Sequence, residues 1–476
     1  MAIEIPDSPH PGSRRFQKVV DAFLSRPGLP FAEILSAARI ERIFAKHDGL
    51  FGRFGVYTTA IMVWSFLSQV LRDGKEASCQ GAVARVVSYY QQAGLGAPTK
   101  DTGDYCRARA KLSEAALHEL SCEVTEELEQ AADESWLWKG KHHAKLIDGF
   151  TFTMPDTPKN RAKYPPPNTQ KPGVGLPIAR TVAILSLATA CVMDLAIGPY
   201  KGKETGELAL LRSMLGSLAP GDIAVADRYY CSYMMIALLY LQGTQTCARK
   251  HHRRHSDFRR GRRLGKHDHL IVWTRPPCPT WMDEETYAQI PETLELREIR
   301  YQIVEPGRRT QTIDIITTLV DADEYTTEDI AELYGFRWNS ELDIRSIKTS
   351  LNLGHVRCKS PEMVEREVRT TILGYNLIRT TAAAAALLHG QQPRQISFTS
   401  TCQYVLASWM LLSSGLIAEA ILGGYIGLML KQIAACEVAN RPGRLEPRVL
   451  KRRRHGYKLM QKPRDELRRE LRKRCT

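Results

Sequence analysis

Apolar residues change their spacing along this chain of 476 residues, and the change divides the chain into parts. From about residue 30 to residue 134 they recur at intervals of three and four, as in Ile40, Ile43 and Phe44, which indicates amphipathic helices. From residue 145 to residue 249 the apolar runs are shorter and read first as strands, then as strands alternating with helices. We therefore predict a helical N-terminal part followed by an α/β part.

The α/β part begins with three strands and continues with two helix–strand units. The predicted strands are Lys145–Phe152, Ile178–Leu187, Cys191–Ile197, Asp222–Ala226 and Thr246–Arg249, and the predicted helices are Lys203–Leu218 and Tyr233–Gln242. Further β-type runs follow at His269–Trp273, Arg300–Val304 and Thr310–Val320. We interpret residues 250–320 as a β-rich insertion into the α/β part.

A window of fifteen residues, YGFRWNSELDIRSIK, carries the most informative polar pattern. On a helix that turns about 100° per residue, one narrow face holds Tyr334, Arg337, Glu341 and Lys348. An adjoining apolar stripe is predicted to be buried, and it consists of Leu333, Phe336, Ile344, Ile347 and Leu351. Because residues four apart on a helix commonly form surface ion pairs, a solvated helix with an Arg337–Glu341 pair is the alternative interpretation.

Two Asp residues stand where strand-like apolar runs stop. Asp148 ends such a run in HAKLIDGFTF, and Asp227 ends one in GDIAVADRYY. With Glu341 from the helix they supply the oxygen ligands that Mg²⁺ prefers, and a pair of such ions can clamp the attacking and leaving oxygens of a phosphodiester. Asp194 and Asp222 are rival acids, but neither ends a strand, so neither is preferred as a ligand.

These residues resemble the DDE transposases of bacterial insertion sequences, in particular the insertion-sequence-four family. The signature of that family is Tyr-x2-Arg-x3-Glu-x6-Lys. The chain matches it at every spacing with Tyr334, Arg337, Glu341 and Lys348. The two Asp of the family carry over to Asp148 and Asp227. The resemblance extends from about residue 145 to residue 379 and is looser over the helical N-terminal part.

The resemblance implies a fold, a reaction and partners. The fold would be α/β, an RNase H-like catalytic core with a β-rich insertion domain, flanked by helical regions; the predicted β-β-β-α-β-α-β order is what an RNase H-like fold requires. The reaction would be cleavage at the ends of a DNA element and strand transfer into target DNA, with two Mg²⁺ ions that Mn²⁺ can replace. The partners would be double-stranded DNA and, in the DNA complex, a second copy of the chain. The alternatives are a metal-dependent nuclease that does not rejoin DNA and a non-catalytic, transposase-derived DNA-binding regulator.

The expected domain order follows from these patterns. We expect a helical DNA-binding domain at residues 1–140, the catalytic core at 141–380 with the insertion at 250–320, a helical region at 381–440 and a basic tail at 441–476. In the N-terminal domain, Asp101 or Thr102 could cap a helix that carries Arg107 and Arg109. That layout is helix-turn-helix-like, and an ordinary helical subdomain with a charged face is the alternative.

Positive charge is unevenly distributed within the formal net charge of +14. Residues 441–476 hold fifteen Lys or Arg and four acids, a net +11, and residues 249–266 hold nine and one, a net +8. Such patches suit a polyanion, and nucleic acid is favoured over anionic lipid because the tail has no amphipathic apolar face. The predicted DNA contacts are Tyr334, Arg337, Lys348, Arg228, Arg253, Arg254, Arg259, Arg260, Arg107 and Arg109.

Three further features of the sequence bear on metal binding and on base stacking. His251, His252 and His255 lack the second pair of Cys or His that a zinc site needs, so a phosphate-binding strip is preferred there. In the resembling transposases a Trp of the insertion can stack on a flipped base. The strand Thr310–Val320 has no Trp, which leaves Trp273 as a weak substitute.

The compartment is inferred from cysteines and from hydropathy. Eleven Cys are scattered singly, which favours a reducing cytoplasm, and the first residues lack the apolar stretch of a secretory signal. The segment Tyr404–Leu430 is mostly apolar, but Glu419 and Gly423–Gly424 interrupt it, so two buried helices are predicted and no membrane span. We expect a bacterial cytoplasmic, nucleoid-associated protein.

Overall fold

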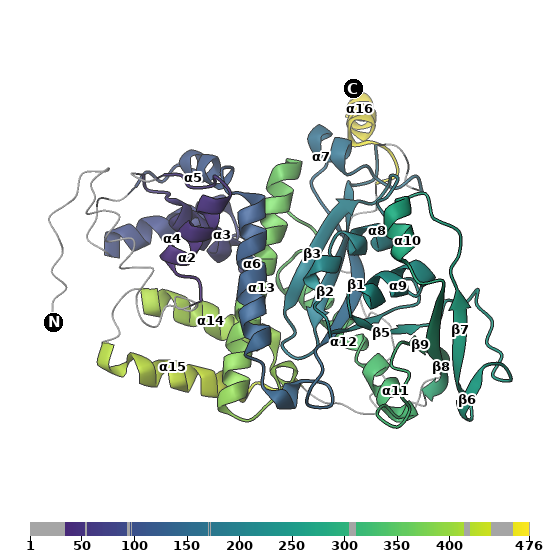
Figure 1. The fold of residues 1–476 in the computed structure, drawn as a ribbon. Coiled ribbons are helices and arrows are strands. Elements are labelled where there is room, and N and C mark those ends of the chain that lie inside the picture. The colour runs from purple at the N-terminus through teal and green to yellow at the C-terminus, as the bar shows by residue number, and fades with distance from the viewer. Residues whose placement is uncertain are drawn as a thin grey trace.

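The computed structural model describes residues 34–475, except 53–54, 93–95, 97, 170, 172, 304–310, 414–418 and 439–459. Within these residues the protein is a mixed α/β molecule around one nine-stranded sheet (Figure 1). The strands are β1 Ala144–Thr153, β2 Ile178–Ser186, β3 Val192–Pro199, β4 Ile223–Ala226, β5 Gln245–Arg249, β6 Arg262–Gly265, β7 Asp268–Thr274, β8 Thr293–Ile303 and β9 Gln311–Thr317. The helices are α2 Ala37–Lys46, α3 Thr59–Val70, α4 Cys79–Gln92, α5 Thr102–Arg109, α6 Glu114–Gln130, α7 Pro158–Lys163, α8 Glu207–Arg212, α9 Tyr233–Leu241, α10 Glu284–Gln289, α11 Thr327–Gly335, α12 Trp338–Arg345, α13 Pro361–Leu388, α14 Phe398–Ser413, α15 Glu419–Ala434 and α16 Arg464–Cys475.

The first five strands form one half of the sheet in the order β3-β2-β1-β4-β5. β2 is antiparallel to β1 and β3 is antiparallel to β2, whereas β4 runs parallel to β1 and β5 parallel to β4. The five strands predicted between residues 145 and 249 are all confirmed. The predicted helix Lys203–Leu218 was too long, because Gly206 is extended at its start and α8 ends at Arg212, before a short 3₁₀ turn.

The other four strands continue the same sheet. β9 pairs antiparallel with β5, and β8, β7 and β6 follow in antiparallel order. The chain between β5 and β9 therefore lengthens the sheet beyond β5 instead of forming a sheet of its own (Figure 1).

Helices cover both faces of the first half of the sheet. On one face α6 and α13 lie side by side and pack on β3, and α13 also contacts α3, which joins the sheet to the N-terminal helices (Figure 1). One hydrophobic core accordingly runs from Phe44 through Leu373 to Leu146. On the opposite face α8 and α9 cover the sheet, where Leu211 packs with Ile147.

The long helix α13 also fixes α12. Asp343 of α12 is 1% exposed, and its two oxygens accept hydrogen bonds from Arg379 at 3.0 Å and from Arg394 at 2.8 Å. A buried carboxylate is stable only when it is paired in this way. The position of α12 against the sheet is therefore set by α13 and by the turn that follows it.

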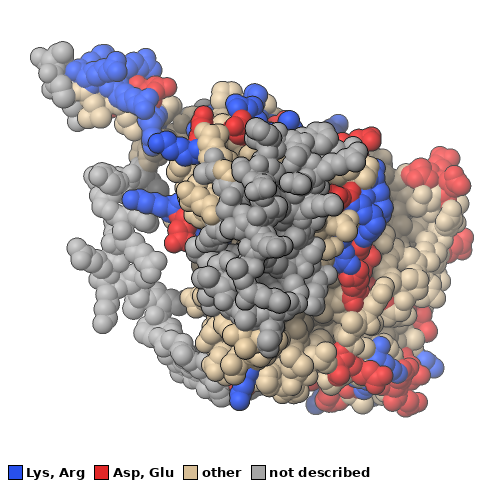
Figure 2. Space-filling model, turned by 90° about the vertical axis from the view of Figure 1, so that its left-hand side faces the viewer, with Lys and Arg blue, Asp and Glu red and all other residues tan. Residues whose placement is uncertain are grey.

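The C-terminal helices only partly match expectation. The apolar segment forms two helices as predicted, α14 and α15, but α15 is only partly buried: Ile421 is 62% and Leu428 is 63% exposed, whereas Ile433 and Ala434 at its C-terminal end are buried. Among the described residues, no helix has both the length and the apolar character needed to cross a membrane. Residues 441–459 of the predicted basic tail lie outside the described residues, and α16 projects at the top of the molecule, where Figure 2 shows Lys and Arg gathered.

Candidate active site

The pairing of β1 with β4 brings Asp148 and Asp227 next to each other. The parallel ladder ends with Ile147 opposite Ala226, so each Asp is the next residue along its own strand. Because neighbouring strands lie about 4.8 Å apart, the two carboxylates leave the sheet from adjacent positions. This closeness depends on the strand register.

Asp148 ends an apolar run in the sequence, but it does not end its strand. β1 continues to Thr153 and keeps pairing with β2, in which Ala183 lies opposite Asp148. What ends at Asp148 is the pairing with β4, since β4 stops at Ala226. Only Asp227 stands at a true strand end, and the edge opened by the short β4 is what exposes both acids.

Helix α12 adds the third acid. The Ser340 hydroxyl donates a hydrogen bond of 2.8 Å to Oδ2 of Asp148, which ties α12 to β1. Arg337 donates to Glu341 Oε1 at 2.9 Å and lies 3.8 Å from Asp148 Oδ2. Because the Arg337 side chain is only 18% exposed and bridges two acids, the solvated-helix interpretation does not describe it.

The window around Glu341 is not one regular helix, which corrects the prediction. α11 ends at Gly335, a tight turn follows in which the Arg337 N–H bonds the carbonyl of Tyr334 at 3.0 Å, and α12 then runs into a π-helical segment, Ser346–Ser350. The tight turn overwinds the chain and the π-helical segment underwinds it, so a constant 100° step does not hold. The apolar stripe was nonetheless predicted correctly for Leu333, Ile344, Ile347 and Leu351, which are all buried, and Phe336 is partly buried.

The remaining signature residues differ in accessibility. Tyr334 is 7% exposed, and burial together with the charge of Asp227 raises its pKa to about 12, although Arg337 and Arg249 act in the opposite direction. Lys348 lies in the π-helical segment, is half-buried and forms no ion pair with a residue that the structure describes. Tyr334 is thus a packed neighbour of the acids, whereas Lys348 has its ammonium group available.

The pKa shifts at the candidate active site indicate that its carboxylates have too little positive charge around them. Burial raises the pKa of Asp148, as does the charge of Glu341, while hydrogen bonds from Ser340 and the Gly149 N–H and the charge of Arg337 oppose the rise. Burial would lower the pKa of Arg337, but its bond to Glu341 and the charge of Asp148 raise it. An arrangement that stabilises a guanidinium between carboxylates also favours other cations.

Asp148, Asp227 and Glu341 are the residues that could hold a divalent metal here. Their donors are all carboxylate oxygens, the set that suits Mg²⁺ and Mn²⁺. Their oxygens do not all lie within 4.8 Å of one another, unlike a second group described below.

Sequence reasoning missed two residues at this site. Glu207, the first residue of α8, has a carboxylate against Gly149, and its pKa is raised by burial and by the charges of Asp148 and Asp227. Trp338 follows Arg337 and is 53% exposed. For Glu207, the sequence signal was the glycine that directly follows Asp148. For Trp338, the signal was the tryptophan inside the signature window.

Trp273 does not suit the role considered for it. It is 8% exposed, packs in the core between α9 and β8, and the Arg254 guanidinium lies 3.7 Å from its ring centroid. A base would have to displace both the core and Arg254. Among the described tryptophans, Trp338 is the exposed aromatic beside the acids.

The predicted basic contacts fall into three places. Arg228 and Arg254 line one hollow with Arg249, Lys250, His251 and His252, directly after Asp227. Arg253, Arg259 and Arg260 are exposed, and the last two pair with Asp257. Arg107 is exposed on α5 and pairs with Asp104, and α5 is capped by Asp101 as predicted.

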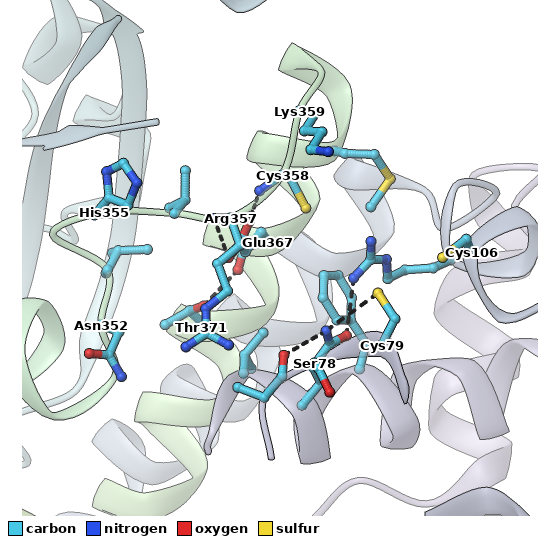
Figure 3. Close-up of a pocket in the computed structure, with 18 of the residues that line it drawn as sticks. Ser78, Cys79, Cys106, Asn352, His355, Arg357, Cys358, Lys359, Glu367 and Thr371 are labelled. Carbon is cyan, nitrogen blue, oxygen red and sulfur yellow. Dashed lines mark hydrogen bonds between the residues drawn. The ribbon is translucent and has the colours of Figure 1, made fainter. Parts of the chain in front are cut away.

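Arg109 lies in a separate cavity of about 760 Å³ between the N-terminal helices and the segment after the π-helix (Figure 3). Its guanidinium bonds Gln69 at 3.0 Å and lies over the rings of Phe66 and Tyr105. On the other wall, Glu367 accepts hydrogen bonds from the backbone N–H groups of Arg357 and Cys358 (Figure 3). None of the three acids lines this cavity, so it is distinct from the candidate active site.

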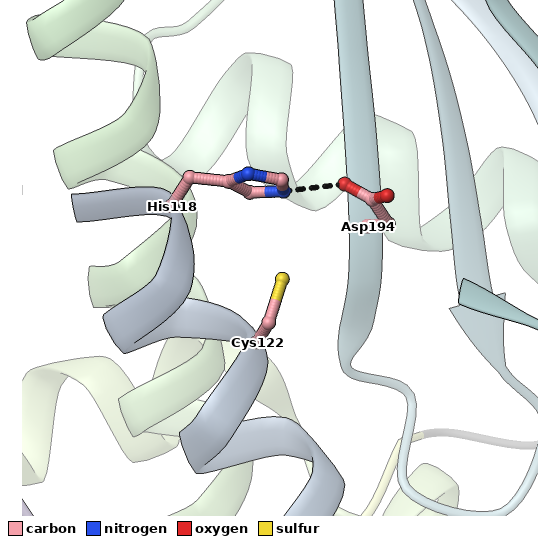
Figure 4. Close-up of side chains that lie close together, drawn as sticks. All are labelled: His118, Cys122 and Asp194. Atoms are coloured by element: carbon pink, nitrogen blue, oxygen red, sulfur yellow. Dashed lines mark hydrogen bonds and ion pairs between the residues drawn. The ribbon is translucent and has the colours of Figure 1, made fainter. Parts of the chain in front are cut away.

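A second group of metal-type ligands joins α6 to β3 (Figure 4). The ligand atoms of His118, Cys122 and Asp194 lie within 4.8 Å of one another. Each is already engaged: Asp194 accepts from His118 at 2.6 Å, from Ser217 and from a backbone N–H, and Cys122 donates to a carbonyl. Burial, with Asp194 adding to it, raises the pKa of Cys122 to about 12, which disfavours the thiolate that a metal needs. The rival acid Asp194 thus has a structural role, and Asp222 likewise accepts a hydrogen bond from the N–H of Ala219.

The mixed parallel and antiparallel sheet thus brings Asp148 and Asp227 together beside the end of the short central strand β4. The transposase DDE domain family matches residues 139–377, which is half of the chain and a range that contains Asp148, Asp227 and Glu341. The chain therefore belongs to the transposases with a DDE domain. The transposase InsG of insertion sequence element IS4 from Escherichia coli (strain K12) is 26% identical over 318 residues, covering 65% of this chain and 68% of InsG.

Two other similar proteins are more limited matches. The transposase of insertion sequence element IS421 from Escherichia coli is 33% identical over 64 residues, which are 13% of this chain and 17% of that protein. A cryo-EM structure of the piggyBac transposase synaptic complex with hairpin DNA aligns with a TM-score of 0.39 and 10% identity, over 89% of this chain and 88% of that one.

Proposed function

We propose that this transposase excises a DNA element by cleaving at its ends and joins the freed 3′-hydroxyls to target DNA. The observation that carries the proposal is the meeting of Asp148 and Asp227, each one residue beyond the last β1–β4 pair, with α12, which holds Glu341. The order β3-β2-β1-β4-β5 supports an RNase H-like core for residues 141–380, with 250–320 as the insertion.

In this proposal Asp148, Asp227 and Glu341 hold two Mg²⁺ ions, for which Mn²⁺ can substitute. Bound ions of this kind lower the barrier by activating the attacking oxygen and stabilising the leaving oxygen. The protein's own contribution is orientation. The Ser340 hydroxyl and the Gly149 N–H each hold one oxygen of Asp148, so that its carboxylate cannot rotate freely.

The cations of the signature would bind the DNA strand at the site. Arg337 presents a planar fork that matches a phosphate, and Lys348 presents a point charge. Arg228 and Arg254 would extend the phosphate path away from Asp227, and the exposed ring of Trp338 offers a stacking surface for an unpaired base. In these DNA-binding roles the side chains lie beside the three acids but do not bind the metal ions themselves.

The other parts of the chain would bind the element ends. We infer that residues 1–140 and the basic tail 441–476 contact double-stranded DNA, that 381–440 is a helical C-terminal region, and that two copies act together in the DNA complex. Exposed apolar side chains on α15, among them Ile421 and Leu428, are available for contact with another chain. The dimer rests on the resemblance to the family.

The test replaces each acid by its amide. Asp148→Asn, Asp227→Asn and Glu341→Gln should each abolish cleavage of DNA carrying the inverted repeats that flank the gene, while binding of that DNA persists. Glu332→Gln, an exposed acid on α11, is the control and should cleave normally. Sequenced products should show element ends joined to target DNA. Complete cleavage without any joined product would assign a nuclease instead, and full cleavage by an amide variant would refute the site.

A further inference from the structure

Glu207 approaches β1 from the face opposite to α12. Side chains alternate along a strand, so Asp148 faces α12 while its neighbours Ile147 and Gly149 face α8, as the packing of Ile147 with Leu211 shows. A Cβ placed on Gly149 would lie 2.6 Å from Cδ of Glu207 and 2.8 and 3.0 Å from its two oxygens. The carboxylate therefore occupies the space that a side chain at Gly149 would fill.

This carboxylate has few compensating partners. The Tyr230 hydroxyl donates to Glu207 Oε2 at 3.2 Å, and within the described residues Glu207 forms no ion pair. The guanidinium of Arg180, the nearby cation, is engaged by the carbonyl of Thr205 at 3.0 Å. Burial raises the pKa of Glu207; the hydrogen bond from Tyr230 and the charge of Arg180 oppose the rise, and the charges of Asp148 and Asp227 add to it. A half-buried carboxylate next to two others is costly unless a cation joins them.

The position of the Glu207 carboxylate against Gly149 and the small number of its partners lead to the same conclusion. We propose that Glu207 is a fourth acidic ligand of the catalytic metal centre, reaching it across Gly149 from α8 while Glu341 reaches it from α12. The inference rests on the proposed function of the other three acids. Each Mg²⁺ takes octahedral oxygen coordination, so a pair of ions has more positions than three carboxylates fill. Gly149 is required because any side chain there would separate Glu207 from the centre.

The competing explanation is structural: Glu207 could serve only to hold Tyr230. The two explanations differ in what Tyr230→Phe does, since that change deletes the hydrogen bond and keeps the carboxylate. They also differ for Gly149→Ala, which keeps every acid but pushes the flexible Glu207 carboxylate aside. Under our proposal Gly149→Ala resembles Glu207→Gln, whereas Tyr230→Phe resembles the wild type.

The experiment measures Mn²⁺ binding without requiring turnover. The full chain is bound to a duplex whose end is already cut, and free Mn²⁺ is followed by electron paramagnetic resonance during titration. Glu207→Gln and Gly149→Ala should each weaken Mn²⁺ binding by about 10-fold, the lower end of what losing a group around a metal costs. Tyr230→Phe and Glu204→Gln, an exposed acid in the loop before α8, should bind Mn²⁺ as the wild type does. The Mg²⁺ concentration for half-maximal cleavage should rise in step with the lost affinity.

The outcomes separate this inference from the proposed function. Unchanged Mn²⁺ binding by Glu207→Gln, with binding lost in Asp148→Asn, overturns the role of Glu207 and leaves the three-acid site intact. Equal losses in Tyr230→Phe and Glu207→Gln also overturn it, in favour of the structural explanation. Mn²⁺ binding that persists in Asp148→Asn would refute the proposed metal centre itself.

Discussion

The hydroxyl of Ser340 donates a hydrogen bond of 2.8 Å to Oδ2 of Asp148 and thereby joins the helix of Glu341 to the central strand. Ser340 is fully buried, and its oxygen also lies 2.8 Å from the carbonyl of Arg337. The geometry of two acids that are far apart in sequence thus depends on one small side chain between them. The residue lies inside the signature window but is not one of the four signature positions.

Ser340→Ala should slow cleavage by about 10-fold, because one hydrogen bond to a charged group is worth about 1.5 kcal/mol and a 1.4 kcal/mol change is a factor of ten. Single-turnover cleavage kinetics at saturating metal measure the effect. Ser346→Ala, which removes a hydroxyl that among the described residues bonds just the carbonyl of Leu342, is the matched control and should cleave at the normal rate. Equal rates for both variants would show that Asp148 needs no such support.

Arg337→Ala should impair end-specific binding or strand transfer more than Arg337→Lys, because Lys keeps the charge but lacks the planar fork. Lys348→Ala should lower the slope of log affinity against log salt by about one unit for each lost phosphate contact. Binding titrations over a range of salt concentrations and assays of joined product provide the readouts. Arg345→Ala, an exposed cation on the same helix, serves as the control, and no difference from it would restore the surface ion-pair interpretation.

Trp338→Ala should weaken the reaction at an end whose terminal base is unpaired, whereas Trp338→Phe should retain most of the activity. Stacking of a base on an aromatic ring is worth about 1–3 kcal/mol, and an exposed ring next to Arg337 is placed to provide it. Fluorescence of 2-aminopurine at the terminal position reports the stacking directly. The idea fails if the Ala variant quenches that fluorescence as fully as the wild type.

Deleting residues 441–476 removes a net +11 but little apolar area, so the fold should survive. The affinity for DNA should fall, with the largest loss at low salt, because screening already suppresses these interactions at high salt. Thermal melting and binding at two salt concentrations test both parts. In the structure Pro463 lies close to Gly173, and a large drop in melting temperature would show that this contact is structural.

Glu129 predicts how stability depends on pH. Burial would raise its pKa, but hydrogen bonds and charge from His143 and Lys145 hold the pKa at about 2 instead of 4.5. Because the folded pKa is depressed, this carboxylate contributes stability above about pH 4.5 and loses it as the pH falls towards 2. Glu129→Gln should therefore cost about 3 kcal/mol at pH 7, as breaking a buried pair does, and the difference from the wild type should shrink between pH 5 and pH 3.

Urea unfolding at several pH values provides this measurement. Glu127→Gln, on the same helix and 54% exposed at its pair with Arg39, should change stability little at any pH, because exposed ion pairs contribute about 0–1 kcal/mol. A constant difference between Glu129→Gln and the wild type across the range would mean that the depressed pKa of Glu129 is not what stabilises the junction of α6 with β1.

Local patterns in the sequence were enough to predict most elements and the family. Apolar spacing located β1 to β5 and the stripe from Leu333 to Leu351, because backbone geometry imposes those periods wherever one side of an element is buried. The signature spacing predicted Glu341 as a site residue, and the ends of apolar runs predicted Asp148 and Asp227. All of these signals lie within about ten residues of the position they describe.

Tertiary structure decided which residues lie next to the three acids. The register of β1 on β4 set Asp148 beside Asp227, the tight turn at Arg337 broke the expected helix, and the docking of α8 placed Glu207 against Gly149. The register of β1 on β4 and the docking of α8 depend on packing between segments that are distant in sequence, and a local period carries no information about the partner. Trp273 ends an apolar run and is 8% exposed, whereas Trp338 stands among polar residues and is 53% exposed.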